Sequence, residues 1–484
     1  MTKPNLYSDH AYNQKNYQNG LKRSQVVVVM VPFPAQGHLN QLLHLSRLIS
    51  SDNIPVHFAG TTTHNSQAKL RVHGFVPSTL SNVFFHDFEI PPFQSPPPNP
   101  NASIKFPSHL QPSFDATSHL REPIAKLLHS LSYTCNRVVV IHDTLMASVV
   151  QDFTSIQNAE SYTFRSISAF ASFWYSWEAM GRPFPVNDEL EKDLPLLKSC
   201  FTSSFKNFIS SQLEYAKFSS GNLYNSSRAI EGEFLDLLQK EPVKGNKKLW
   251  AIGPLNPIEK SDQNNKSSGR RHECLHWLDK QSPRSVIFVS FGTTTSLTDQ
   301  QIIEIATGLE KSAIKFIWAL RDADKGDIFS GEVRNIELPK GYENRVKERE
   351  RGLVVRDWAP QLDILRHPST GGFMSHCGWN SCMESISHGV PIAAWPMHSD
   401  QPRNCMLITK LLKIGIVVND WECRDQLVRP SDIVNAVRRL IDSKEGAEIR
   451  RRAVELCLSV GRKSVAEGGI SRMELDSFVA HISR

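Results

Sequence analysis

Apolar runs alternate along the chain with segments in which apolar residues recur at helical spacing. Residues 26–31 form a continuous run of mostly β-branched residues, and in residues 39–50 Leu and Ile recur every three or four positions. The first pattern predicts a buried strand, and the second predicts an amphipathic helix. Further strands are predicted at residues 55–59, 137–141, 249–252, 286–291, 315–320, 352–355 and 371–376, with helical patterns such as 298–311 between several of them. Strands that alternate with helices predict an α/β fold with parallel sheets.

Polar segments divide this pattern into domains. The first 24 residues are polar and rich in Asn, Gln, Tyr and Lys, and residues 254–273 are polar, charged and poor in large apolar residues. Such composition is typical of tails and linkers. We therefore expect a disordered tail over residues 1–24, an N-terminal domain over 25–253, a linker over 254–273, a C-terminal domain over 274–460 and a final amphipathic helix within 461–484.

Length, charge and cysteine usage narrow the function classes. A chain of 484 residues exceeds one ordinary core, so we expect two domains. The net charge of +6 is spread over 55 basic and 49 acidic residues without a long basic run, which argues against a nucleic-acid partner. The eight cysteines are scattered and form no CxxC pair, so we expect reduced thiols in the cytoplasm rather than a zinc site.

Neither secretion nor membrane insertion is expected. The first 24 residues lack the apolar core of a signal peptide, and the apolar run at 26–33 is too short to cross a bilayer. We therefore expect a cytoplasmic protein. We also expect it to be a monomer. The proline-rich stretch at residues 91–108 is expected to form a surface loop or lid, because strand and helix patterns resume on both sides of it.

The segment 358–401 combines a strand, a glycine turn and the start of a helix. Residues 371–376 form an apolar strand pattern, and Gly378 interrupts it. The helix pattern that follows starts near Asn380 and Ser381, which are both good N-cap residues. Such a turn aims free backbone N–H groups and the positive end of the helix dipole at one point. The sequence therefore predicts a phosphate or diphosphate site here.

Three further side chains of this segment are suited to a nucleotide sugar. His376 is a donor at the edge of the turn, and Trp358 can stack on a base. Glu384 lies one turn into the predicted helix, where its carboxylate can accept hydrogen bonds from two ribose hydroxyls. The alternatives are that Ser381 and Glu384 form only a capping box and that Trp379 is an ordinary core residue.

A histidine and an aspartate follow two of the predicted strands. His38 lies between the first strand and its helix, and Asp143 follows the strand at 137–141. The carboxyl ends of strands are where α/β sheets bind ligands. A helix N-terminus disfavours positive charge, so we expect His38 to stay neutral and act as a general base, with Asp143 orienting its ring. The alternatives are a structural histidine and an aspartate that caps a helix.

An acceptor site is expected in the N-terminal half, where aromatic and apolar residues cluster near loops. The candidate acceptor-binding residues are Phe88, Met146, Ser166 and Trp174. Ser166 is also a candidate to reach the transferred sugar. The alternative for Trp174 is a core position, because Trp174 and Trp177 show helical spacing.

From WAPQ at its start through HCGWNS to the final DQ, the segment 358–401 resembles the signature box of plant secondary-product UDP-glycosyltransferases. The resemblance implies uracil stacked on Trp358, ribose held by Gln361 and Glu384, diphosphate held by His376, Asn380 and Ser381, and sugar contacted by Trp379, Asp400 and Gln401. Ala359 and Gly378 belong to the same box, and Thr293 is expected to add a hydroxyl near the phosphates. In the family a terminal Gln accompanies a preference for UDP-glucose.

Two N-terminal segments carry the same resemblance. PFPAQGHLNQ and HDTLMAS are similar to the segments that hold the family's catalytic histidine and supporting aspartate, which assigns these roles to His38 and Asp143. Gln41 stands where many members have proline, a departure that bears only on loop shape. The implied fold is GT-B, two Rossmann-like domains facing across a cleft, with the final helix crossing back to the N-terminal domain. The implied reaction is inverting transfer from a UDP-sugar to a small hydroxylated acceptor, with no cofactor and no metal ion.

Nearly the whole chain after residue 24 resembles the zeatin O-glucosyltransferase and zeatin O-xylosyltransferase branch of this family, in segments such as IPPFQSPPPNP and RDADKGDIF. The implied acceptor is the side-chain hydroxyl of zeatin, a cytokinin, and the implied donor is UDP-glucose. Alternative acceptors are a flavonoid, another phenol or a terpenoid alcohol, and the alternative donor is UDP-xylose. The alternative classes are an inactive nucleotide-sugar-binding protein and a dinucleotide-dependent oxidoreductase, although neither half has GxGxxG after its first strand.

Overall fold

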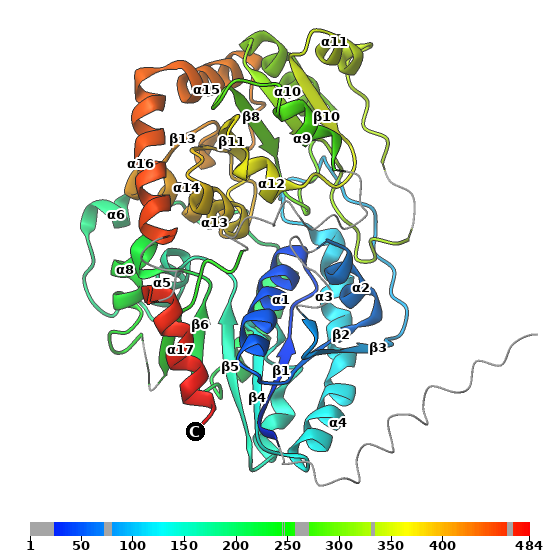
Figure 1. Ribbon diagram of the computed structural model, residues 1–484, viewed down its shortest axis with the longest axis vertical. Helices are drawn as coiled ribbons and strands as arrows, with labels where there is room; N and C mark the ends of the chain where they lie inside the picture. Colours follow the sequence, from blue (N-terminus) through cyan, green and yellow to red (C-terminus); the bar gives the residue numbers. More distant parts are fainter. Residues whose placement is uncertain are drawn as a thin grey trace, which may run out of the picture.

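Two parallel sheets, each covered by helices, lie one above the other in the computed structural model (Figure 1). The structure describes residues 24–71, 80–243, 245, 247–256, 271–330, 334–461 and 468–484. The predicted tail lies outside these residues except for Ser24, and so does the predicted linker from residue 257 to residue 270. The expected two-domain α/β architecture with parallel sheets is confirmed.

The N-terminal sheet has seven parallel strands in the order β3-β2-β1-β4-β5-β6-β7. Its strands are β1 (Ser24–Val31), β2 (Val56–Thr61), β3 (Val83–Phe88), β4 (Cys135–Asp143), β5 (Ala159–Arg165), β6 (Gly221–Tyr224) and β7 (Lys248–Ala251). The central strands β1 and β4 are covered on both faces, which is why they read as runs of valine and isoleucine. The sequence did not predict β3, β5 and β6, because these strands mix polar residues into short apolar stretches.

The C-terminal sheet has six parallel strands in the order β10-β9-β8-β11-β12-β13. Its strands are β8 (Val286–Ser290), β9 (Lys315–Ala319), β10 (Gly352–Val355), β11 (Thr370–Ser375), β12 (Ile392–Ala394) and β13 (Gly415–Val417). The four strands predicted in this half are confirmed to within two residues at each end. The strands β12 and β13 have only three residues each, too few for a periodic signal.

Helices connect the strands and cover both sheets. The N-terminal half holds α1 (Gln36–Ser51), α2 (Thr62–Arg71), α3 (Gln111–Asp115), α4 (Arg121–Ser132), α5 (Ala169–Ala179), α6 (Asp188–Lys192), α7 (Ser203–Ala216) and α8 (Arg228–Leu237). The C-terminal half holds α9 (Glu273–Leu278), α10 (Asp299–Ser312), α11 (Tyr342–Glu348), α12 (Gln361–Arg366), α13 (Trp379–His388), α14 (Gln401–Met406), α15 (Pro430–Asp442), α16 (Lys444–Val460) and α17 (Ile470–Ile482). Shorter helical turns are η3 (Ser108–Leu110), η4 (Ala116–Leu120), η5 (Thr144–Met146), η6 (Gln151–Ser155), η7 (Leu407–Leu411) and η8 (Trp421–Cys423).

The last helix, α17, lies against the N-terminal sheet although it follows the C-terminal domain along the chain (Figure 1). Leu475, Phe478 and Ile482 belong to the same apolar cluster as the central strands of that sheet. The Phe478 ring lies 5.1 Å from the Tyr162 ring and 5.2 Å from the Trp250 ring, measured between centroids. These aromatic contacts fix the end of the chain to β5 and β7.

Candidate functional site

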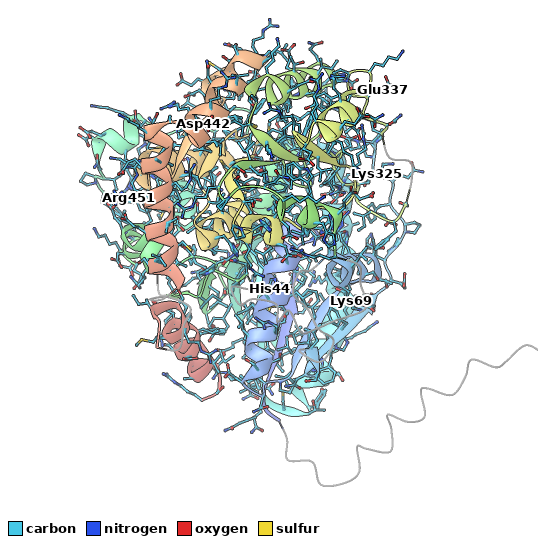
Figure 2. All side chains as sticks on the ribbon, turned by 45° about the horizontal axis from the view of Figure 1, so that its top comes forward. His44, Lys69, Lys325, Glu337, Asp442 and Arg451 are labelled. Atoms are coloured by element: carbon cyan, nitrogen blue, oxygen red, sulfur yellow. The ribbon has the colours of Figure 1, made fainter. Side chains whose placement is uncertain are left out.

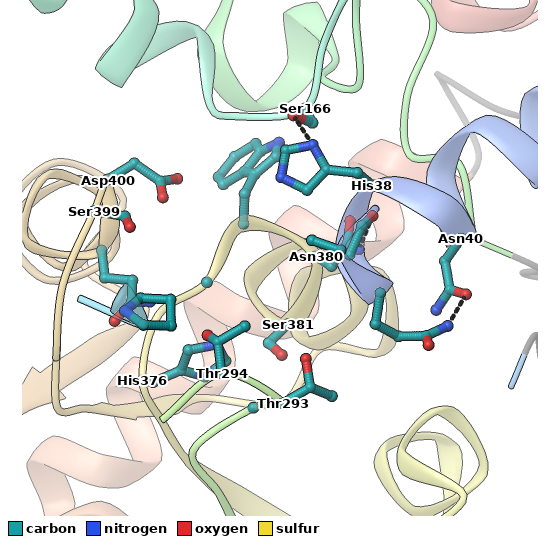
Figure 3. A pocket seen from close by; sticks show the side chains of 18 of the residues that line it. His38, Asn40, Ser166, Thr293, Thr294, His376, Asn380, Ser381, Ser399 and Asp400 are labelled. Carbon is teal, nitrogen blue, oxygen red and sulfur yellow. Dashed lines mark hydrogen bonds between the residues drawn. The ribbon is translucent and has the colours of Figure 1, made fainter. Parts of the chain in front are cut away.

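A cavity of about 260 Å³ lies where the carboxyl ends of the central strands of both sheets meet. The N-terminal domain contributes residues that follow β1, β4 and β5, and the C-terminal domain contributes residues that follow β8, β9, β10, β11 and β12. His38 and Ser166 line one side of the cavity, and Thr293, His376 and Ser381 line the opposite side (Figure 3). Crevices at strand ends are the usual ligand sites of such sheets.

The structure brings His38 and Asp143 into direct contact. His38 lies in the first turn of α1, and its Nδ1 is 2.7 Å from Oδ2 of the fully buried Asp143. The Ser166 hydroxyl is 3.0 Å from the same ring nitrogen. The other carboxylate oxygen of Asp143 accepts a hydrogen bond from the Leu145 N–H at 2.9 Å and so caps η5. Asp143 therefore has both predicted roles: one carboxylate oxygen contacts His38, and the other caps a helical turn.

The surroundings of His38 shift its pKa in both directions. Burial lowers the pKa of His38, but the charge and hydrogen bond of Asp143 and the charge of Asp400 raise it, and the net result is a raised pKa. The sequence pointed to the helix N-terminus, which favours the neutral ring, and the structure adds two carboxylates that act in the opposite direction.

The glycine turn before α13 closes tightly around His376. A Cβ atom on Gly292 or on Gly378 would lie 2.5 Å from Nε2 of His376, so only glycine fits on these two sides of the ring. Gly292 also has a φ of +77°, which glycine adopts without strain. Burial lowers the pKa of His376 to about 4, so the ring is neutral at physiological pH. Its Nδ1 is buried without a hydrogen-bond partner among the described residues.

Helix α13 begins earlier than the sequence pattern indicated. Its N-cap is Gly378 and its first residue is Trp379, so neither Asn380 nor Ser381 caps the helix. No capping box forms, because Ser381 is already inside the helix. The Gln361 side chain instead donates hydrogen bonds to Ser381 Oγ at 3.0 Å and to Glu384 Oε2 at 2.7 Å. Burial raises the pKa of Glu384 to about 7, against the lowering effect of the Gln361 hydrogen bond.

Two side chains at the start of α13 reach across to the N-terminal domain. Asn380 Nδ2 donates a hydrogen bond to the Gly37 carbonyl at 2.7 Å, next to His38. Trp379 Nε1 donates to the Asn225 carbonyl at 2.7 Å. Trp379 is only 3% exposed and packs in an apolar cluster while it also lines the cavity. Trp379 therefore occupies a core position, as the alternative stated, and also borders the cavity.

Asp400 and Gln401 lie at the start of α14, where buried hydrogen bonds hold both side chains. Asp400 accepts a hydrogen bond from Asn404 Nδ2 at 2.8 Å. Burial raises the pKa of Asp400, against the lowering effects of Asn404 and of the charge of His38. Gln401 accepts hydrogen bonds from the N–H groups of Met397 and His398 at 2.9 and 3.0 Å. The loop after β12 is thereby fixed against the helix.

All the residues predicted to hold the UDP-sugar line the same cavity. They are Thr293, Trp358, Ala359, Gln361, His376, Gly378, Trp379, Asn380, Ser381, Glu384, Asp400 and Gln401. The geometry brings these residues together but does not by itself assign their roles.

The candidate acceptor residues are mostly placed elsewhere. Ser166 lines the cavity, but Met146 is fully buried in an apolar cluster of the N-terminal domain and Phe88 packs against that cluster. Trp174 is fully buried in a different cluster, as the core alternative stated. None of these three side chains lines the cavity. For Trp174 the reason is that aromatic residues at helical spacing give the same pattern whether they face a core or a cavity.

Other aromatic residues, which the sequence did not single out, line this side of the cavity instead. They are Phe33, Phe106, Phe114 and Phe205. The ring centroids lie 4.6 Å apart for Phe33 and Phe114, and 4.5 Å apart for Phe106 and Phe205. Phe106, which is 5% exposed, lies near the end of the proline-rich stretch, so this predicted surface loop contributes one wall of the cavity. The apolar residues Ile104 and Phe106 in an otherwise polar and proline-rich stretch were the available signal.

Two further observations concern metal ions and membranes. Among the described residues, no group of three or more His, Cys, Asp or Glu side chains is arranged to hold a metal ion. Within the same part of the chain, none of the helices is both long and apolar enough to pass through a bilayer.

Family models match both halves of the chain. Residues 24–257 match the model described as glycosyltransferase, N-terminal domain, and residues 223–449 match UDP-glucoronosyl and UDP-glucosyl transferase. The structure is similar to that of Phytolacca americana UGT2 complexed with UDP-2fluoro-glucose and pterostilbene, with a TM-score of 0.73, 26% identity, and coverage of 95% of this chain and 100% of that chain. The two facing domains therefore form the GT-B fold that was expected.

Two relatives match over nearly their full length. The chain is 58% identical over 477 residues to the zeatin O-glucosyltransferase of Phaseolus lunatus, which covers 98% of this chain and 100% of that protein. It is 56% identical over 464 residues to the zeatin O-xylosyltransferase of Phaseolus vulgaris, which covers 95% of this chain and 99% of that protein. Identity of this extent, together with a cavity lined by the whole signature box, shows that the chain belongs to the family of UDP-glycosyltransferases and is an enzyme that uses a UDP-sugar.

Proposed function

We propose that this enzyme transfers glucose from UDP-glucose to the side-chain hydroxyl of zeatin and inverts the anomeric centre, giving the O-β-glucoside. The observation that carries the proposal is the contact between His38 and Asp143 at the edge of a cavity that all the signature-box residues line. The extensive identity to a zeatin O-glucosyltransferase supports zeatin as the acceptor.

In this proposal His38 is the general base. Nδ1 is engaged by Asp143 and Ser166, so Nε2 is the nitrogen that takes the proton of the acceptor hydroxyl. Asp143 fixes the tautomer and stabilises the imidazolium that forms during the reaction. Deprotonation makes the hydroxyl oxygen nucleophilic, and in-line attack on the anomeric carbon expels UDP from the opposite face.

The donor roles follow from where charge develops. Leaving UDP gains negative charge, which the N-terminus of α13 and neutral His376 stabilise with donors already in place, together with Asn380, Ser381 and Thr293. With these donors on the diphosphate, we propose that the transfer needs no metal ion.

The contacts with ribose, uracil and glucose are assigned to the other residues that line the cavity. Glu384 and Gln361 bind the ribose, Trp358 and Ala359 pack against uracil, and Trp379, Asp400 and Gln401 contact the glucose. The side chain of Gln401 also orders the loop before it, which supports a role in shaping the sugar pocket.

We propose that zeatin lies against the four phenylalanine rings on the N-terminal side of the cavity, with its hydroxyl directed at His38. A flat heteroaromatic ring suits such a surface, because offset and edge contacts between rings are favourable. In this scheme the N-terminal domain (25–253) binds the acceptor, the C-terminal domain (274–460) binds the donor, and the segment 461–484 ties them together. One chain supplies the whole cavity, which supports a monomer, and we propose that it acts in the cytoplasm.

Product analysis tests the acceptor. The purified protein is incubated with UDP-glucose and a panel of zeatin isomers, flavonoids, other phenols and terpenoid alcohols, and the products are identified by mass spectrometry. We expect zeatin O-glucoside as the main product and none with the His38→Ala variant. If other acceptors are glucosylated and zeatin is not, the proposed acceptor is wrong and the proposed glucosyl transfer stands. UDP binding without any product would indicate an inactive binding protein.

A second donor has support of its own. Identity to the zeatin O-xylosyltransferase is almost as high as to the glucosyltransferase, so UDP-xylose is the competing candidate. A competition assay with equal UDP-glucose and UDP-xylose decides between them. We expect the glucoside to dominate, and a dominant xyloside would assign the chain to xylosyl transfer.

A further inference from the structure

A loop of the C-terminal domain, residues 321–327 after β9, is held by side chains of the N-terminal domain. Arg71 at the end of α2 donates to both carboxylate oxygens of Asp324, at 2.5 and 3.2 Å. Both side chains are about 10% exposed. A shielded, two-point Arg–carboxylate pair is stronger and more directional than an exposed ion pair. Figure 2 shows Lys69 of α2 and Lys325 of the loop on the same flank of the molecule.

Two histidines of the N-terminal domain hold the same loop through its backbone. His109 Nε2 is 2.8 Å from the Asp324 carbonyl, and His64 Nε2 is 3.2 Å from the Gly326 carbonyl. Burial lowers the pKa of His64 to about 4 and also lowers the pKa of His109, which favours neutral rings that can each donate from Nε2 to a carbonyl. We call Arg71, His64, His109 and the loop 321–327 the interdomain clasp.

The clasp is joined to the donor side of the cavity at two points. The Asp324 N–H donates a hydrogen bond to the Thr293 carbonyl at 2.8 Å, and Thr293 lines the cavity. The Arg71 guanidinium carbon lies 4.6 Å from the centroid of the Trp358 ring, and that of Arg321 lies 5.4 Å from it. Arg321 also donates to Asp324 at 2.6 Å. One carboxylate therefore organises two cations beside the indole.

We infer that Arg71 is a positioning residue for the donor: it packs on Trp358 directly and, through Asp324, holds Arg321 and Thr293 in place, so that the nucleotide site is completed only when the two domains are apposed. The inference rests on the proposed binding of UDP beside Trp358. Because Arg71 belongs to the N-terminal domain, it gives that domain a part in donor affinity without a place in the cavity lining. Neither Arg71 nor Asp324 lines the cavity, so their loss should leave the acceptor wall in place.

Steady-state kinetics and UDP titration calorimetry test this inference on Arg71→Ala, Arg71→Lys, Asp324→Ala and the Arg71→Ala/Asp324→Ala double variant. We expect each alanine variant to raise the KM for UDP-glucose and the Kd for UDP about tenfold, with the acceptor KM unchanged and kcat within about threefold. The double variant should match the single variants, because the two residues act as a unit. Arg71→Lys keeps the charge but loses the two-point geometry, so it should fall between wild type and Arg71→Ala.

The matched control is Arg451→Ala, which removes an exposed arginine paired with Glu448 on the opposite flank (Figure 2). This control should leave every constant unchanged. An unchanged Kd for UDP in Arg71→Ala, or equal losses for donor and acceptor, would overturn the inference and leave a purely structural ion pair. If Arg71→Ala does not fold, Arg71→Lys decides by the same criterion. Failure of the wild-type protein to bind UDP would instead refute the proposed function.

Discussion

The two walls of the cavity are built on different principles. The donor wall comes largely from one contiguous segment, 358–401, and its polar groups are already joined by hydrogen bonds, as in the set of Gln361, Ser381 and Glu384. The acceptor wall is assembled from phenylalanine rings of three separate segments of the chain. These rings are Phe33, Phe106 with Phe114, and Phe205.

This difference predicts different selectivity on the two sides. A site built from hydrogen-bonding groups rejects a ligand that leaves those groups unpaired, whereas an apolar pocket distinguishes one methylene by only about 1–3 kcal/mol. We therefore expect strict recognition of the UDP moiety and graded recognition of acceptors. Substitutions on each side of the cavity test this contrast, and the first is at His38 on the acceptor side.

Substitution of His38 should have the largest effect. In His38→Ala the base is lost, and we expect kcat to fall about 10³-fold because general-base catalysis contributes about 10²–10⁴-fold. The Kd for UDP should stay unchanged, since His38 lies on the acceptor side. Single-turnover kinetics and calorimetry measure the two quantities. Retention of turnover would remove His38 from the role of base, and lost UDP binding would show that the two walls are not independent.

The Asp143→Asn variant should lower kcat about 10²-fold and should shift its pH dependence. The base is active when deprotonated, so activity falls as the pH drops through the pKa of His38, which the Asp143 charge and hydrogen bond and the charge of Asp400 raise against burial. Without the Asp143 carboxylate, burial lowers that pKa, and the acidic limb of the kcat/KM profile should move to lower pH. If the acidic limb of the Asp143→Asn profile stays at the wild-type pH, this pairing is contradicted.

Loss of Glu384 should weaken the donor wall alone. We expect Glu384→Ala to cost about 2 kcal/mol, or about thirtyfold in the Kd for UDP, as for other hydrogen bonds to charged groups. Because burial raises the pKa of Glu384 to about 7, only the ionised form above that pH offers both oxygens to ribose. UDP affinity should therefore rise as the pH increases through about 7, and this trend should vanish in Glu384→Gln. A flat wild-type profile would argue against ribose contact.

The smallest effect is expected on the acceptor wall. Phe106→Ala removes one of several rings, so we expect the KM for zeatin to rise about tenfold or less, in line with about 0.5–1.5 kcal/mol for an aromatic pair. The donor constants should not change. Phe329→Ala, at a ring that is 56% exposed, is the matched control. A loss as large as that of Glu384→Ala would show that acceptor recognition is not graded.

The same contrast explains how much of the site could be predicted from the sequence. The donor wall is local: a strand, a turn and a helix follow one another, so the pattern around Gly378 placed its residues near the phosphate turn. The N-cap is Gly378, two or three residues before the predicted Asn380 or Ser381, because the turn exposes backbone groups there without the side-chain cap that a sequence pattern detects.

The acceptor wall was not predictable in this way. Trp174 and Phe205 both lie on helices and both are buried, yet only Phe205 faces the cavity. No periodicity distinguishes an apolar face that packs against a core from one that lines a pocket, since the choice is made by the packing of distant segments. For the same reason, polar strands such as β5, whose Ser161 and Thr163 are fully buried, escaped the prediction.

The hydrogen bonds from Trp379 and Asn380 across the cleft both end on main-chain carbonyls, those of Asn225 and Gly37. A carbonyl oxygen is present whatever side chain its residue carries. These two contacts therefore do not depend on the chemical type of the side chain at positions 225 and 37. Chimeric genes that join the first half of one relative to the second half of another should keep both contacts and, where the Arg71–Asp324 pair is also retained, should yield working enzymes with the acceptor range of the first parent.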